Sequence, residues 1–339
     1  MRILYGVQTT GNGHISRSRE VIKELKKKGY DITVIFSGQK SSLQNDSKDF
    51  EPYKIFKGFT FYTRKGRIDY LKTIFDFSPF DFYSDLKKIE NEIFDLVITD
   101  YEPLTARVAK KKKIPSIGIS HQYSFLYDIP MTGTNPITKF ITKKFAPVDY
   151  PIGCHWHHFD SPIVPPIIPY YLKTEKTIEN KILVYLAFEE LKFVRKLLSN
   201  FPDYEFYIYH GDCLNEDVEN LHYRSFSRSG FLNDLTECNG IITNAGFEMA
   251  SEALHIGKKV LVKPLKGQME QTSNALAMEK LKLGFTMKKL SKKITKEFLE
   301  CKENKQIRYS NIAKYIADWI YEGSFDLNKL VEKTWKLEE

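Results

Sequence analysis

A glycine turn between an apolar run and a helix-forming segment is the clearest candidate for ligand chemistry in the sequence. Residues 241–274 read as a strand, the turn Asn244-Ala245-Gly246-Phe247, a helix, a second strand and an acidic-polar loop. Backbone N–H groups of the turn, at a helix N-terminus, form an anion site that suits a phosphate. Glu252 in the helix and Glu270-Gln271 after the second strand supply acceptors for hydroxyl groups. This combination suits a nucleotide sugar.

A second glycine turn lies near the start of the chain. Gly11-Asn12-Gly13-His14 follows an apolar strand at residues 2–7 and opens a helix that reaches about residue 28, before a second strand at 31–36. Strand, helix and strand in this order imply a parallel sheet. A dinucleotide site is excluded because Ser16 stands where a third glycine is needed, and no acid ends the second strand.

Polar residues also follow two later strands of the same half. Asp100, Tyr101 and Glu102 follow a strand at 95–99, and His121-Gln122 follows a strand at 116–120. Ligands bind at the carboxyl edge of parallel strands. We therefore expect these residues to line the same cleft as the first glycine turn.

The pattern of strand and helix restarts after a proline-rich stretch. Prolines at 162, 165, 166 and 169 exclude a helix or a central strand there and predict a stiff linker. Strands at 181–186 and 205–209 with a helix between them begin a second α/β unit. The predicted organisation is a first domain at 1–164, a linker at 165–180, a second domain at 181–322, and a final helix at 323–339 that packs back across the domains.

Composition narrows the class of protein. The chain has 339 residues, 42% of them hydrophobic, which suffices for two packed cores. Its four cysteines are widely spaced, and no apolar run is long enough for a spanning helix, so we expect a cytoplasmic protein without a disulfide framework. Of the net charge of +8, residues 1–164 carry 25 basic against 18 acidic residues, or +7. An anionic partner such as a membrane surface and ordinary solvated lysines both explain this excess.

Three further patterns each have two interpretations. The aromatic residues of 40–94 suggest core packing, or a surface on which sugar or lipid stacks. Residues 137–145, ITKFITKKF, fit an ordinary surface helix or a basic amphipathic helix at a membrane surface. The histidine cluster at 155–158 suggests a metal, but alternation along an extended segment separates its members and no further ligand is evident, so no metal is expected. Charge alone does not indicate nucleic acid.

The GNGH turn at 11–14 together with NAGFEMASEAL and KPLKGQMEQ resembles the glycosyltransferases of the GT-B fold. The closest resemblance is to the UDP-glycosyltransferases, to the N-acetylglucosaminyltransferase that makes lipid II, and to an archaeal and bacterial group related to both. The resemblance covers both halves in matching order. It implies two Rossmann-like domains that face a central cleft, with the acceptor held by the first and the nucleotide sugar by the second.

The resemblance also implies roles for the residues. The turn at 244–247 would hold the donor diphosphate, Glu252 the ribose hydroxyls, Glu270-Gln271 the sugar hydroxyls, and Ser227 or Phe226 would lie near the base. In an inverting transfer His14 or Asp100 would deprotonate the acceptor hydroxyl. The helix terminus would stabilise the leaving diphosphate, with no metal or other cofactor. A lipid-linked or anionic acceptor, with peripheral membrane contact, fits the basic first half.

The chain departs from the family's pattern in three places. Leu186-Ala187-Phe188-Glu189-Glu190 replaces a glycine-rich loop, Lys259 replaces a proline, and the pair Glu270-Gln271 is shifted relative to Pro264. Two other functions therefore stay open. A UDP-sugar epimerase would use acids such as Glu189 around the donor sugar, and a nucleotide-sugar sensor would bind without transfer.

Overall fold

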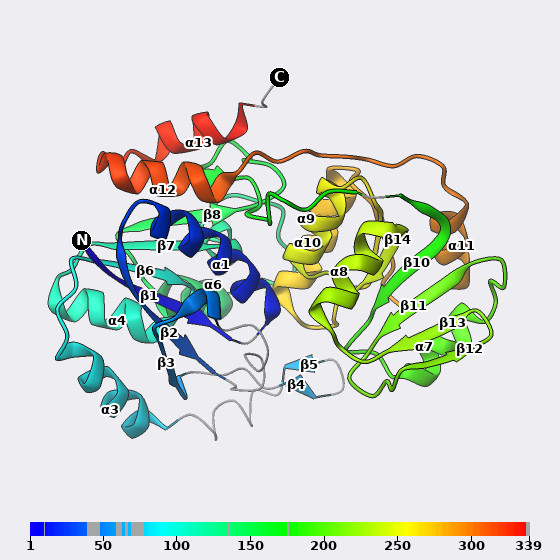
Figure 1. Ribbon diagram of the computed structural model, residues 1–339, viewed down its shortest axis with the longest axis horizontal. Coiled ribbons are helices and arrows are strands. Elements are labelled where there is room, and N and C mark those ends of the chain that lie inside the picture. Colours follow the sequence, from blue (N-terminus) through cyan, green and yellow to red (C-terminus); the bar gives the residue numbers. More distant parts are fainter. Residues whose placement is uncertain are drawn as a thin grey trace.

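The structure is a computed structural model that describes residues 1–9, 11–38, 48–58, 63–64, 67–68, 78–134, 136–174 and 176–336. It has two α/β domains, each built around its own sheet, side by side along the long axis of the molecule (Figure 1). The aromatic residues expected to pack or stack between 59 and 62, and those at 75 and 77, lie outside the described residues. Phe50 and Phe56 of the same stretch are described, and Phe50 is fully buried.

The first domain has a seven-stranded parallel sheet in the order β3-β2-β1-β6-β7-β8-β9. Its strands are β1 (Arg2–Gln8), β2 (Asp31–Ser37), β3 (Tyr53–Phe56), β6 (Leu96–Asp100), β7 (Ser116–Ser120), β8 (Tyr150–Cys154) and β9 (Ile163–Val164). A separate hairpin pairs β4 (Thr63–Arg64) with β5 (Arg67–Ile68). The helices are α1 (Asn12–Lys27), η2 (Lys48–Phe50), α3 (Pro79–Glu90), α4 (Pro103–Lys112), α5 (His121–Ser124) and α6 (Pro136–Phe145).

Helices cover both faces of this sheet, which explains why its strands are continuous apolar runs. In β1 the side chains of Ile3, Tyr5 and Val7 pack with the apolar residues of α1, whereas Leu4 points to the other face, where α3 and α4 lie. The first two predicted strands and the helix between them are confirmed to within about two residues. The parallel order brings the carboxyl ends of β1 and β6 together, since Val7 pairs with Asp100.

The second domain has a seven-stranded sheet in the order β12-β13-β11-β10-β14-β15-β16. Among the described strands of this sheet, only β12 runs antiparallel to its neighbour. Its strands are β10 (Ile178–Tyr185), β11 (Glu205–Tyr209), β12 (Glu216–Val218), β13 (Leu221–Arg224), β14 (Cys238–Thr243), β15 (Lys259–Val262) and β16 (Phe285–Thr286). Its helices are α7 (Leu191–Leu198), α8 (Arg228–Glu237), α9 (Phe247–His255), α10 (Met269–Lys280) and α11 (Lys292–Glu300).

The chain returns to the first domain earlier than the predicted boundary at 322. A stretch after α11 leads to α12 (Ile312–Glu322) and α13 (Leu327–Trp335), which lie over the first domain in Figure 1. The helix α12 packs against α1, and α13 packs against β9. Trp319 and Ile320 of α12 are buried there, because the apolar face of this helix finds its partner on the first domain rather than the second.

Between α10 and α12 the chain is not continuously helical, since β16 and a nonhelical stretch from Cys301 to Asn311 lie there. The predicted linker is partly buried, because Ile167, Ile168 and Leu172 lie in the same core as the first sheet. None of the described helices is long and apolar enough to cross a membrane.

Candidate functional site

The GNGH segment is the start of α1, not a free loop. Gly11 caps the helix in an extended conformation, and Asn12, Gly13 and His14 form its first turn. The His14 side chain is almost fully buried, and its Nδ1 lies 2.8 Å from Oδ1 of Asp100 at the end of β6. The two residues proposed as alternatives for the base therefore form one hydrogen-bonded pair.

Asp100 is fully buried and saturated with donors. Arg17 donates to both carboxylate oxygens, from Nε at 3.0 Å and from Nη2 at 2.7 Å, and the Ser18 hydroxyl adds a third contact at 3.0 Å. Burial alone raises the pKa of Asp100, but the charges and hydrogen bonds of Arg17 and His14 outweigh it, so the pKa of Asp100 lies below its ordinary value. The carboxylate stays ionised and orients its neighbours.

The pairing with Asp100 selects the tautomer of His14. A carboxylate only accepts, so Nδ1 of His14 carries the hydrogen and Nε2 keeps its lone pair. No described residue hydrogen-bonds Nε2. The ring is thus arranged as a base whose free nitrogen can take a proton from a bound hydroxyl.

The second glycine turn lies between β14 and α9, as predicted, but its donors differ from the expectation. The N–H of Gly246 already donates to the Asn244 carbonyl at 2.7 Å. No side chain caps α9, so the N–H groups left available for an anion are those of its first turn, from Phe247 onward. The Asn244 amide donates to the Lys263 carbonyl at 3.0 Å, which fixes the turn to β15, and Ala245 is buried behind it.

Glu252 of the second domain contacts helix α1 of the first domain. One carboxylate oxygen of Glu252 accepts a hydrogen bond from the Ser16 hydroxyl of α1 at 3.3 Å. Burial raises the pKa of Glu252 to about 7, against an opposing effect of Arg228. Ser227, predicted to lie near the nucleobase, is the exposed N-cap of α8 and accepts from the Gly230 N–H. The neighbouring Phe226 is largely exposed.

Glu270 and Gln271 lie in the first turn of α10 rather than in a loop. The carbonyl oxygen of the Gln271 side chain accepts from the Leu265 N–H at 2.9 Å and holds the preceding segment. Glu270 accepts from the Gln122 amide of the first domain at 3.1 Å. A predicted donor residue of the second domain and a predicted acceptor-side residue of the first domain are therefore in direct contact.

The other predicted acceptor-side residues have structural partners. Glu102 is fully buried and caps α4, accepting from the Leu104 and Thr105 N–H groups and from the hydroxyls of Thr105 and Ser37. Tyr101 has a left-handed backbone, and its hydroxyl donates to the Thr142 carbonyl. Both oxygens of Glu102 are thus occupied, and the hydroxyl hydrogen of Tyr101 is used within the first domain.

His121 forms part of the joint between the domains. Its ring stacks on Phe247 with centroids 3.9 Å apart and planes 2° apart. Its Nδ1 lies 2.8 Å from the Cys154 carbonyl and its Nε2 lies 2.7 Å from the Asn274 amide oxygen. The Asn274 amide nitrogen in turn donates to the Ala245 carbonyl at 3.1 Å, so this contact supports the second glycine turn.

The histidines of the 155–158 cluster are grouped differently from strict alternation, which would place His155 and His157 on one face and His158 on the other. His155 is buried against the His121 ring, while His157 stacks on His158 and both lie beside Trp335. No group of three His, Cys, Asp or Glu side chains among the described residues is arranged to hold a metal ion.

Two residues of the site were missed from the sequence. Arg17 is 2% exposed and, besides binding Asp100, ion pairs through Nη1 with Glu248 in the first turn of α9. Burial raises the pKa of Glu248 to about 8, although Arg17 opposes the shift. Arg17 follows His14 by three residues, a helical spacing that places both on one face and could have signalled it.

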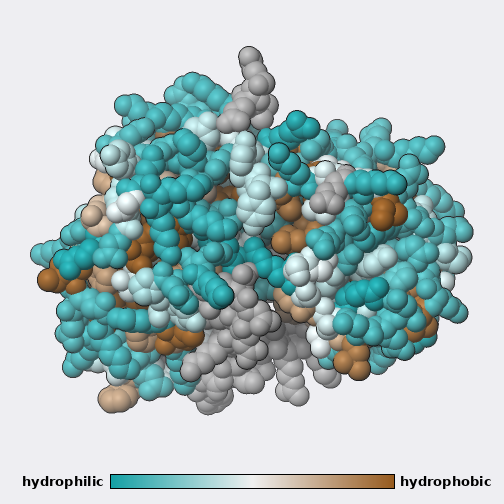
Figure 2. All heavy atoms as spheres, in the orientation of Figure 1, coloured by the Kyte–Doolittle hydropathy of each residue, from teal (hydrophilic) through white to brown (hydrophobic). Residues whose placement is uncertain are grey.

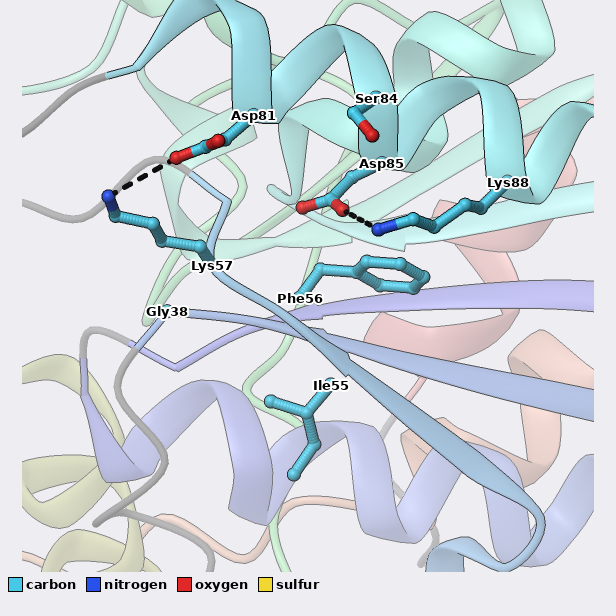
Figure 3. A pocket seen from close by; sticks show the side chains of 8 residues that line it. All are labelled: Gly38, Ile55, Phe56, Lys57, Asp81, Ser84, Asp85 and Lys88. Carbon is cyan, nitrogen blue, oxygen red and sulfur yellow. Dashed lines mark hydrogen bonds and ion pairs between the residues drawn. The ribbon is translucent and has the colours of Figure 1, made fainter.

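A separate cavity of about 530 Å³ lies on the first domain between β3 and α3 (Figure 3). Phe56 lines it, and two ion pairs, Lys57 with Asp81 and Lys88 with Asp85, lie at its walls. The charges of this cavity are paired with each other. The cavity does not include His14 or Asp100, so the chemistry of the site is not located there.

The sequence model of glycosyl transferase family 1 matches residues 1–301 of the chain. No curated protein matches the sequence. Solved structures share the fold over nearly the whole length. The Arabidopsis thaliana glycosyltransferase UGT89C1, crystallised with UDP, superposes with a TM-score of 0.63 at 12% identity, covering 98% of this chain and 99% of that one.

Two further solved structures give similar results. The glycosyltransferase SnogD from Streptomyces nogalater superposes with a TM-score of 0.58 at 14% identity, covering 98% and 96% of the two chains. The spinosyn rhamnosyltransferase SpnG, crystallised with thymidine diphosphate, gives 0.57 at 10% identity, covering 98% and 95%. These likenesses confirm the predicted GT-B fold of two Rossmann-like domains.

Proposed function

Because the chain belongs to glycosyl transferase family 1, we propose that it is an inverting glycosyltransferase that moves a sugar from a nucleotide-diphosphate donor to an acceptor hydroxyl. One observation carries the proposal. His14 is held by Asp100 with its Nε2 unpartnered among the described residues, and α1, which bears it, meets the donor helix α9 through the Arg17 and Glu248 pair. A base and an anion site therefore face each other from different domains.

The reaction follows from this arrangement. Nε2 of His14 accepts the proton of the acceptor hydroxyl as its oxygen forms a bond to the anomeric carbon of the donor sugar. The bond from that carbon to the diphosphate oxygen breaks, and the electron pair remains on the diphosphate. A single displacement from the face opposite the leaving group inverts the anomeric configuration.

Donor residues take the roles that the family pattern suggests. The first-turn N–H groups of α9 hold the diphosphate, Glu252 accepts from the ribose hydroxyls, and Glu270 accepts from the sugar. The developing negative charge on the leaving group is met by the helix terminus and by buried Arg17, so the proposed transfer needs no metal. UDP is the proposed nucleotide, and dTDP is the rival, since solved relatives of this fold bind one or the other.

A lipid-linked or anionic acceptor is proposed from helix α6 and from the charge of the first domain. Phe140 is 63% exposed and Ile141 is 46% exposed, beside the exposed Lys143 and Lys144. The face in Figure 2 is mostly hydrophilic over both domains, so exposed apolar side chains are few on that face. In a co-sedimentation assay at low salt, wild type should pellet with phosphatidylglycerol vesicles and a Phe140→Ser variant should stay in the supernatant. Equal sedimentation of wild type and variant would refute this part of the proposal.

The observation that favoured an epimerase has another explanation. Glu189, an acid in the loop that replaces the expected glycines, forms an ion pair with Lys263. It is therefore occupied rather than poised over a donor sugar. No other described contact favours epimerisation over transfer.

A donor screen and a product analysis test the proposal. A ligand at a hundred times its Kd stabilises the protein by about 2.7 kcal/mol, so the true donor should raise Tm in a panel of UDP, dTDP and GDP sugars. The identified donor, incubated with candidate acceptors, should give a glycoside of inverted configuration by NMR, and His14→Ala should abolish it while keeping donor binding. A product of retained configuration, or a panel without any shift, would refute the proposal.

A further inference from the structure

Among the described side chains, only Arg17 contacts both the His14–Asp100 pair of the first domain and helix α9 of the second domain. Its Nε and Nη2 are anchored on Asp100, and its Nη1 reaches Glu248 of α9. The guanidinium is 2% exposed, so these contacts are hardly screened by water. Since Asp100 fixes two of the three nitrogens, Nη1 can change its partner while the rest of the side chain stays in place.

Glu248 occupies the ground that a donor diphosphate needs. It is in the first turn of α9, beside the N–H groups that form the anion site. Its side chain also packs on the first glycine turn, because a Cβ added to Gly13 would lie 2.6 Å from the Glu248 Cγ. At this point a carboxylate of the protein itself is the counter-ion of Arg17.

The charges around Glu248 do not allow it to stay ionised next to a diphosphate. Arg17 from α1 is the cation that contacts Glu248. The negative charges of Asp100 from β6 and Glu252 from α9 disfavour an ionised Glu248, and the Cys154 thiol from β8 lies close enough to interact electrostatically with it. Burial has already raised the pKa of Glu248 to about 8. A diphosphate in the same space adds two negative charges, and like charges in a buried site favour the protonated acid.

We propose that Arg17 exchanges partners during donor binding, its Nη1 passing from the Glu248 carboxylate to the donor diphosphate while Glu248 takes up one proton from solvent. The inference rests on the proposed function and extends it. Arg17 becomes a catalytic residue that contacts the leaving group, and Glu248 is its placeholder in the donor-free protein. The same guanidinium keeps its hold on Asp100 and so joins the filling of the donor site to the base.

Calorimetry measures the proton directly. UDP-glucose and dTDP-glucose are suitable probes, because both phosphates of a nucleotide sugar are diesters and do not titrate near neutral pH. Titrations at pH 9 in buffers of different ionisation enthalpy should show uptake of nearly one proton per donor bound. With a free-protein pKa of about 8, ionisation of Glu248 should make wild-type affinity at pH 9 about tenfold lower than that of a protein whose residue 248 stays uncharged.

The Glu248→Gln variant supplies the matched test, since its amide mimics the protonated acid. It should bind the donor without proton uptake and about tenfold more tightly than wild type at pH 9. The control Glu279→Gln, an exposed position at the far end of α10, should behave as wild type. Arg17→Lys in the Glu248→Gln background should weaken binding again at every pH, because a point charge cannot serve Asp100 and a diphosphate together.

The outcomes separate this inference from the function on which it rests. Donor binding by wild type without proton uptake, or an alkaline loss of affinity that survives in Glu248→Gln, would overturn the exchange and leave the transferase proposal standing. Failure of every nucleotide sugar to bind wild type would overturn both. The wild-type calorimetry decides the question even where the variant folds poorly.

Discussion

Replacing Asp100 by asparagine tests whether its carboxylate serves the reaction or only the fold. The amide keeps the size of the side chain and removes its charge. An asparagine can turn its NH₂ group toward His14, which favours the tautomer with the hydrogen on Nε2 and deprives the ring of its free lone pair. Asp100→Asn should therefore lower kcat by roughly 10²–10⁴-fold, the range that a positioned base contributes, with little change in the donor KM.

The same substitution should also lower stability, by an amount the contacts allow us to bound. Removing one partner of a buried ion pair costs about 3–5 kcal/mol when the other charge is left uncompensated. Glu248, which is ionised above about pH 8, stays beside Arg17 as a second acid, so the lower end of that range is expected at pH 9. Urea unfolding at pH 9 gives this value, and rates are compared under conditions where each variant is more than 95% folded, a threshold of roughly 2 kcal/mol.

A double-mutant cycle separates catalysis from folding. Kinetics are measured for His14→Ala, Asp100→Asn and the double variant with the donor found by the screen. Residues that act as one unit lose activity non-additively, so the double variant should be no slower than His14→Ala alone. Multiplicative losses in the cycle would show that Asp100 acts through the fold, and the reasoning from the His14 contact would be refuted.

Three further predictions follow from single contacts. Gly13→Ala should lower kcat at least tenfold without unfolding the first domain, because the added Cβ would clash with Glu248 of the second domain. Gly11→Ala is the control, since a Cβ there meets nothing within 4 Å. Equal kcat values for the two variants would contradict this prediction. Glu252→Gln should weaken donor binding by about 10–100-fold and remove the loss of wild-type affinity below about pH 7, where the carboxylate protonates; calorimetry at pH 6 and 8 tests both. The folded pKa of Glu248 is raised to about 8, so the contribution of Glu248 to stability is present at low pH and is lost as pH rises toward 8. Between pH 6 and pH 9 the Tm of wild type should therefore fall more than the Tm of Glu248→Gln. Parallel Tm curves for the two proteins would refute this prediction.

The location of His14 and Asp100 at the same edge of the sheet could be predicted from the sequence. Both residues follow apolar strands of a parallel sheet, and a ligand edge collects the residues that end such strands. The sheet places β1 beside β6, so the two positions are neighbours. The strand order could not be read from the sequence, because apolar runs buried on both faces carry no mark of which run lies next to which.

The same reasoning placed Glu102 at the ligand-binding edge, although its side chain is used to cap a helix. It also follows β6, but Pro103 begins a helix directly after it, and a side-chain acceptor before a proline at the first helical position is a capping pattern. The pattern was readable and points inward, toward the N–H groups of Leu104 and Thr105. Local hydrogen bonds outweighed position along the strand.

Contacts between the domains were beyond the sequence. Arg17 and Glu248 are 231 residues apart, and nothing local to either segment fixes how the two sheets face each other. The return of α12 is a similar case. Its amphipathic face predicts a helix with a buried side, and only the packed structure shows that α1 covers it.

The second domain lacks the glycine-rich loop that the resemblance implies, so other groups must stabilise the negative charge of the leaving diphosphate in the proposed transfer. The loop 186–190 that replaces it is closed by the ion pair of Glu189 with Lys263, and the Glu189 carbonyl also contacts His210. Lys263 is therefore neutralised from its own domain, and the first turn of α9 supplies backbone donors on this side. Arg17 is the buried cation that contacts this turn among the described residues, and its position is set by Asp100 and not by the second domain. In the proposed transfer, stabilisation of the diphosphate thus depends on the first domain being docked, and a donor bound to an undocked second domain would lack both the catalytic base and this cation.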